Sequence, residues 1–172
     1  MAEVKARSLA VLALAVMLPG AWISQGLADH EAVFPMPKEK QYVDECGSCH
    51  TAYAPGLLPA RSWLRLMAGL ERHFGEDASI EATVRDRLTR SLVELAADSP
   101  ASNLLMQRIN AAIPAGDTPE RITRGGFFKY MHDEVPAAIW NRPGIGSPAN
   151  CGACHTKANS GRYPEREILI PK

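Results

Sequence analysis

A pair of cysteines three positions apart, followed at once by a histidine, occurs twice in this 172-residue chain. The two copies read CGSCH at residues 46–50 and CGACH at residues 151–155. Their members are, in chain order, Cys46, Cys49, His50, Cys151, Cys154 and His155. Thiols at this spacing lie on one helical turn, where each can add across a vinyl group of haem, and the adjacent imidazole can then bind the iron. The repeated pattern predicts two covalently attached haem c groups.

Other uses of paired cysteines explain less of the pattern. Four thiolates can hold zinc, but that reading leaves the two adjacent histidines without a role. A thioredoxin-type redox site would need alternating strands and helices, which the sequence does not indicate. Disulfides between cysteines three residues apart would constrain almost no chain. The two motifs also use all four cysteines, so none remains for a further disulfide or a nucleophile.

The remaining histidines are candidates for the second axial position of each iron. Of the five histidines, two belong to the motifs and His30 lies in a proline-containing lead-in, which leaves His73 and His132. A haem iron bound by one imidazole needs a sixth ligand to be low-spin and inert to small molecules. Both histidines could instead be ordinary core or surface residues, and Met67 or Met131 could compete for the position.

Loop length favours a sequential assignment of these ligands. His50 with His73, and His155 with His132, are each separated by 23 residues, whereas the crossed pairs are separated by 82. Closing the shorter loops costs less chain entropy, although the difference is modest. We therefore assign His50 and His73 to the first iron and His155 and His132 to the second, with the crossed arrangement left open.

The N-terminus has the pattern of a secretory signal peptide over residues 1–28. Lys5 and Arg7 form a positive segment, residues 8–18 are continuously apolar, and small residues precede a cleavage point after Ala28. The apolar run is shorter than the roughly 20 residues that span a bilayer, although an uncleaved anchor remains an alternative. We expect the mature chain, residues 29–172, to be periplasmic and not stably inserted in the membrane.

The mature segment predicts a mostly α-helical fold with few or no strands, wrapped around the two haems. Helices are expected over residues 42–46, 59–74, 77–95, 99–113 and 118–135, the last interrupted at 125–126. Apolar spacing of three and four in the second of them places His73 on its buried face, and Asp77 and Ser99 are the expected N-caps of the next two. Residues 141–150 read as a loop. One domain is expected, with possible lobes at 29–98 around the first haem and 99–172 around the second.

The charge pattern of the chain argues against nucleic acid as a partner. The chain has 19 basic and 19 acidic residues and no basic run. A nucleic-acid-binding surface is therefore not expected.

The chain resembles the small exported dihaem cytochromes c of proteobacteria. The similarity lies in residues 42–53, 57–59, 62–63, 73–75, 121–123, 131–132, 139–140, 146–151 and 168–171. Residues 125–128, with the sequence GGFF, depart from the more conventional helix start of that family. The resemblance implies a periplasmic electron carrier with two bis-histidine haems. It also implies electron exchange with a small monohaem c-type cytochrome that can bind oxygen, and with a membrane b-type cytochrome.

These observations together predict outer-sphere electron transfer rather than catalysis. Two imidazoles keep the iron six-coordinate in both redox states, so little reorganises when an electron arrives, and they lower the reduction potential relative to methionine ligation. No catalytic residue is expected. The competing hypothesis is a dihaem enzyme of the peroxidase or oxygen-reducing type, in which one iron keeps an exchangeable position.

Overall fold

The computed structural model describes residues 32–172, and within that range the chain is helical. The predicted signal peptide and His30 lie outside the described residues. No strand forms in residues 32–172, where extended pairing is limited to isolated bridges such as Val33 with Arg162 and His155 with Ile168. The predicted helical fold class is confirmed.

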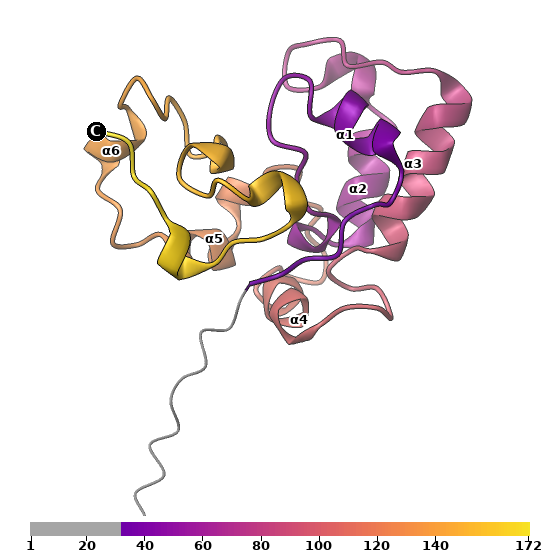
Figure 1. The fold of residues 1–172 in the computed structure, drawn as a ribbon. Coiled ribbons are helices and arrows are strands. Elements are labelled where there is room, and N and C mark those ends of the chain that lie inside the picture. Colours follow the sequence, from indigo (N-terminus) through magenta and orange to yellow (C-terminus); the bar gives the residue numbers. More distant parts are fainter. Residues whose placement is uncertain (1–31) are drawn as a thin grey trace, which may run out of the picture.

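The α-helices are short and separated by turns (Figure 1). Their bounds are α1 Lys40–Cys46, α2 Ala60–Met67, α3 Ala82–Glu94, α4 Leu104–Ala111, α5 Gly126–Met131 and α6 Ala137–Trp140. Single 3-10 turns are η1 Pro55–Leu57, η2 Leu70–Arg72, η3 Ile122–Arg124, η4 Cys151–Ala153, η5 Ala158–Ser160 and η6 Glu165–Glu167. None of the helices in residues 32–172 is long and apolar enough to cross a bilayer.

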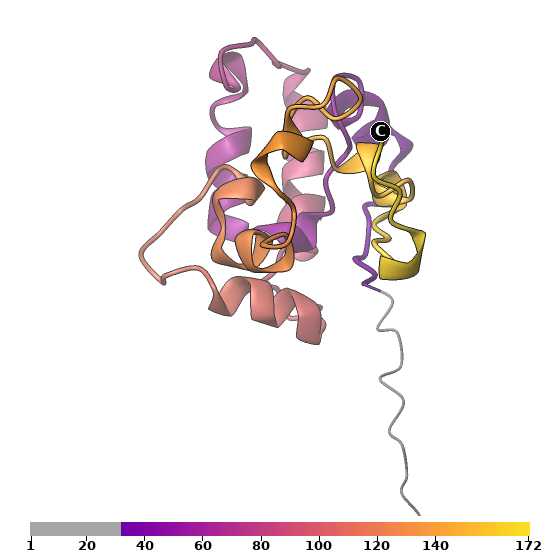
Figure 2. The ribbon, with the colours of Figure 1, turned by 90° about the vertical axis from the view of Figure 1, so that its left-hand side faces the viewer.

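The first hydrophobic cluster lies between α1, α2 and α3, and α2 runs alongside α3 in both views (Figures 1 and 2). Leu88 and Leu92 of α3 are almost fully buried against Trp63 and Met67 of α2. The Trp63 indole Nε1 donates a hydrogen bond of 2.7 Å to the Pro55 carbonyl, so its one polar atom is satisfied. This cluster fixes the segment that follows the first cysteine motif.

A second cluster connects the N-terminal segment with α4. Phe34, Ala54 and Ala97 pack there against Met106 and Ile109 of α4. The backbone continues the connection, because the Phe34 amide donates to the Gly161 carbonyl at 2.8 Å. The start and the end of the described chain are thereby held together. The predicted division into lobes stays a prediction.

The helix expected over residues 59–74 is wrong in its second half. α2 ends at Met67, Gly69 follows, and the chain forms the 3-10 turn η2 before reaching His73. Glycine disfavours helix continuation, and the Ala78 amide donates to the Leu70 carbonyl at 2.9 Å, which folds the chain back. His73 therefore lies beyond the helix and not on its apolar face.

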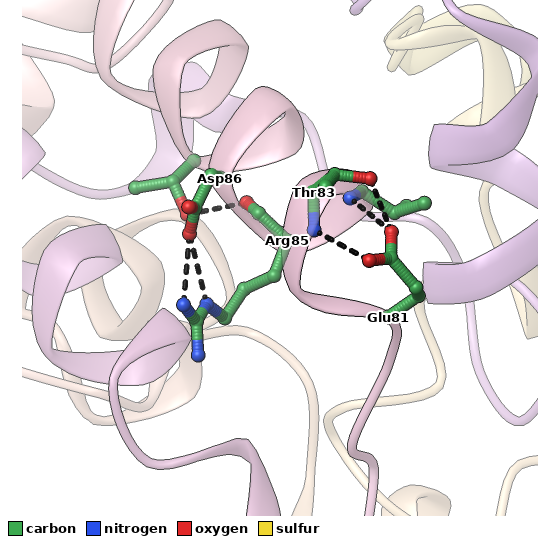
Figure 3. Close-up of polar contacts among 6 residues, drawn as sticks. Glu81, Thr83, Arg85 and Asp86 are labelled. Atoms are coloured by element: carbon green, nitrogen blue, oxygen red, sulfur yellow. Dashed lines mark hydrogen bonds and ion pairs between the residues drawn. The ribbon is translucent and has the colours of Figure 1, made fainter.

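The next two helices begin later than expected, because other residues cap them. Glu81 caps α3: its carboxylate accepts hydrogen bonds from the amides of Thr83 at 3.0 Å and Val84 at 3.1 Å (Figure 3). Asn103 caps α4 by accepting from the Met106 amide at 3.0 Å. Asp77, the expected cap of the first, accepts from the Ser79 amide in a turn instead.

The helix expected over residues 118–135 is also largely wrong. The chain forms only η3 and the six-residue α5, and a four-residue helix, α6, begins after Pro136 and was not predicted. Helix formation fails before Gly126 and again after Met131, so His132 lies just past α5. The loop expected over residues 141–150 is confirmed, since no helix forms there.

Replacement of Leu88 by Ala tests the first cluster. Leu88 is fully buried, so truncation leaves a cavity and should lower the free energy of unfolding by about 2–5 kcal/mol. Leu104→Ala is the matched control, because that side chain is 78% exposed and should change stability little. Denaturant unfolding of the holoprotein measures both, and equal losses would contradict the assignment of the core.

Replacement of Glu81 by Gln tests the cap of α3. Hydrogen bonds from Thr83, and then from the Thr83 and Val84 amides, hold the pKa of Glu81 below its ordinary value of 4.5. A carboxyl with a depressed pKa in the folded state stabilises the protein above the unfolded pKa and loses that effect as the pH falls. Thermal unfolding should show a lower Tm for the variant at pH 7, with the difference vanishing as the pH falls through the lowered pKa of Glu81. A difference independent of pH would refute the cap.

Candidate functional site

The first cysteine motif is presented by the end of α1. Cys46 is the last residue of the helix, and Gly47 follows with its amide donating to the Val43 carbonyl at 2.9 Å. A Cβ at Gly47 would lie only 2.4 Å from that carbonyl oxygen, so the close turn requires glycine. The turn leads to Cys49 and His50, both of which are exposed.

The His50 ring has a defined tautomer and orientation. Its Nδ1 lies 2.7 Å from the Thr51 carbonyl, which can only accept, so this nitrogen carries the proton. The ring stacks on Tyr53 at a centroid distance of 4.8 Å and an interplanar angle of 19°. Nε2 is left with its lone pair, as a metal-binding imidazole requires.

His73 faces His50 across a gap of suitable size for an iron. The ring centroids are 6.1 Å apart and the planes differ by 29°. A metal bound to one nitrogen of each ring would separate the centroids by about 6 Å, given a metal–nitrogen bond of about 2 Å and about 1 Å from that nitrogen to the ring centre. The residues present at this site fit a six-coordinate haem iron.

At the second motif the two histidine rings have the same centroid separation, although different elements position them. Cys151 opens η4, Cys154 follows it, and the His155 centroid lies 6.1 Å from that of His132, with the planes 85° apart. His132 Nδ1 lies 2.9 Å from the Phe128 carbonyl of the preceding turn, which again leaves Nε2 free. His155 Nδ1 is buried and has no partner within residues 32–172.

Among the described residues, the structure thus brings together His50 with His73 and His132 with His155. The two methionines that could compete for the second axial position are placed differently. Met67 is buried in the first hydrophobic cluster, whereas Met131 lines the cavity beside His132 with 58% of its surface exposed.

A cavity of about 500 Å³ adjoins the second histidine pair. Its lining is mostly apolar and includes Phe127, Ile139 and Trp140, together with His132 and His155. Burial lowers the pKa of His155, and the neighbouring His132 lowers it further. Such an environment favours the neutral imidazole that a metal needs.

Burial shifts the pKa values of His73 and of two cysteine thiols toward the neutral form of each group. Burial first, then His50 and the Arg121 guanidinium, lower the pKa of His73. Burial raises the pKa of Cys46 and of Cys151 to about 11. Burial thus favours the neutral form of all three groups.

The two motifs contact one another. The Tyr53 hydroxyl donates a hydrogen bond of 2.6 Å to the Ala149 carbonyl, two residues before Cys151. A Cβ added at Gly152 would lie 3.2 Å from the Thr51 hydroxyl oxygen. Segments about a hundred residues apart in sequence therefore form one continuous binding region.

Comparison with known proteins decides the family. A family profile described as dihaem cytochrome c matches residues 42–163. The chain belongs to the dihaem cytochrome c family. Accordingly it carries two haem c groups, and the resemblance read from the sequence is confirmed.

Solved structures agree with this assignment. A diheme cytochrome c from Rhodobacter sphaeroides is 40% identical, with a TM-score of 0.66, and the match covers 76% of this chain and 99% of that one. A diheme cytochrome type c from Shewanella baltica OS155 is 36% identical, with a TM-score of 0.64 and coverage of 79% and 95%. A search of curated proteins gives no match.

Sequence reasoning included one residue of the region, Arg121, in the family resemblance but did not predict its contacts. Arg121 lines the cavity of the second histidine pair, and its guanidinium carbon lies 4.0 Å from the centroid of the Phe74 ring, next to His73. No local pattern indicates this position, because the contact joins segments that are remote in sequence.

Removing one pair of attachment thiols tests whether the sites are independent. We expect the double variant C151A/C154A to retain one covalent haem, because Cys46 and Cys49 are unaffected, and the pair C46A/C49A to retain the other. Mass spectrometry of the exported protein counts the groups, with the wild-type chain carrying two. Two covalent haems in either double variant would contradict the assignment of the thiols.

Proposed function

We propose that this chain is a periplasmic electron carrier with two low-spin, bis-histidine haems. The single observation that carries the proposal is the pair of imidazole separations, 6.1 Å at both sites. Each haem supplies a one-electron Fe(III)/Fe(II) couple when bound. The chain's own residues hold that group, fix its axial ligands and limit solvent access.

The imidazoles serve this function through their fixed orientation. His50 and His132 each donate Nδ1–H to a backbone carbonyl, so their rings need not turn when the charge of the iron changes. His73 and His155 have lowered pKa values and remain neutral ligands at pH 7. A site with little to rearrange suits outer-sphere transfer.

The proposed location and partners follow from the sequence. A cleaved signal over residues 1–28 would deliver the chain to the periplasm, where c-type haem is attached. Its partners would be a small monohaem c-type cytochrome, a membrane b-type cytochrome, or both, as the family resemblance implies. The alternative function, a dihaem enzyme of the peroxidase or oxygen-reducing type, requires one of the four imidazoles to leave its iron.

Replacement of His73 or His132 by Ala tests the ligand set. Low-temperature electron paramagnetic resonance of the oxidised holoprotein should show two low-spin centres, and each substitution should convert one of them to high spin while sparing the other. His30→Ala is the control, because the remaining histidine should alter neither signal. If two low-spin centres survive in His73→Ala or His132→Ala, the assignment of the replaced histidine as an axial ligand is wrong.

Carbon monoxide binding separates the carrier from the enzyme. The reduced wild-type protein should show no spectral change with carbon monoxide, since both axial positions are filled, and each alanine variant should bind it at one haem. Binding by the wild-type protein would favour the enzymatic alternative.

A further inference from the structure

Arg121 occupies a position between the two histidine pairs. It precedes η3, in the connection between α4 and α5. On one side its guanidinium carbon lies 4.0 Å from the centroid of Phe74, whose ring lies 4.7 Å from that of His73. On the other side Arg121 lines the cavity that His132 and His155 share. One cation thus borders both sites.

Arg121 forms no ion pair with a carboxylate in the described part of the chain, although Glu134 and Glu165 line the same cavity. The nearest acidic neighbour in sequence, Glu120, pairs with Arg65, and no ion pair within residues 32–172 involves Arg121. Its contact with Phe74 is a cation–π interaction, which positions the guanidinium without cancelling its charge. Arg121 therefore places a positive charge beside Phe74 and His73 and on the wall of the cavity that His132 and His155 share.

We propose that the positive charge of Arg121 raises the reduction potentials of both haems. Reduction adds one electron from the redox partner to ferric iron and gives ferrous iron, with no bond made or broken. Each site becomes more negative by one charge, so a fixed cation nearby stabilises the reduced form. The cation partly offsets the lowering of potential that two imidazole ligands produce.

Coulomb's law sets the scale of the effect. A unit charge about 10 Å from an iron, at an effective dielectric constant of about 20, changes the ratio of reduced to oxidised haem about tenfold. Arg121 is exposed, so water and dissolved salt weaken the effect. The neutral variant should therefore differ most from the wild type at low ionic strength.

The test is a spectroelectrochemical titration of the holoprotein of Arg121→Gln. Both midpoint potentials should fall, so that at a fixed applied potential the reduced fraction decreases several-fold at each haem. Arg121→Lys keeps the charge and should retain most of the wild-type values. If Arg121→Gln does not incorporate two haems, Arg121→Leu gives the same neutral charge with an apolar chain against Phe74.

Arg124→Gln is the matched control. Arg124 is the last residue of η3, the turn that Arg121 precedes, and it borders the depression formed by Arg65, Phe74 and Glu120, but it does not line the cavity of the second pair. Its loss should leave the potential of the second haem unchanged. The inference would be overturned if the midpoint potential of Arg121→Gln fell at one haem only or at neither. It would also be overturned if Arg121→Lys lowered both potentials as much as Arg121→Gln does.

This inference rests on the proposed bis-histidine carrier, and the two can fail separately. Carbon monoxide binding by the wild-type protein would refute the carrier without any measurement on Arg121. Unshifted potentials in Arg121→Gln, with both haems low-spin, would refute the role of Arg121 and leave the carrier intact.

Discussion

The separation of two facing imidazole rings is the constraint on which the rest of the structure depends. It is met twice at 6.1 Å, by rings that come from four different segments. Each of the four histidines lies at or shortly after the C-terminal end of a helical element, namely α1, η2, α5 and η4. Short helices suit this requirement, because each one ends near a histidine and the chain can change direction after it.

Contacts that are remote in sequence hold these helix ends in place. Tyr53 joins the first motif to the carbonyl of Ala149, and the N-terminal segment pairs with the segment after the second motif through Phe34 and Gly161. The hydrophobic cluster between α1, α2 and α3 packs against Cys46 and Tyr53 of the first site. The binding region therefore depends on the whole described chain, since neither motif is positioned by its neighbours alone.

The two haem c groups could be predicted because the pattern that indicates them is local, two thiols and an imidazole on adjacent turns, and the assignment of those residues as the attachment sites stays a prediction. The helical fold class could be predicted in the same way, because apolar spacing of three and four is also a local pattern. Helix ends could not be predicted so well, because Glu81 rather than Asp77 caps α3 and because α2 stops before Gly69. His73 was identified by elimination, yet its position depends on those ends. Arg121 falls in the 121–123 part of the family resemblance, but its contacts with Phe74 and with the cavity could not be predicted, because they join segments that are remote in sequence.

The two sites are not equivalent although their motifs are nearly identical. Cys46 ends an α-helix, whereas Cys151 follows an irregular loop and opens a 3-10 turn. The imidazole planes differ by 29° at the first pair and by 85° at the second, where an apolar cavity also adjoins the rings. Burial and the hydrogen bonds around a haem site are among the properties by which a protein sets a haem potential. The short motif thus determines where each haem is attached, and the surrounding chain determines how each one behaves.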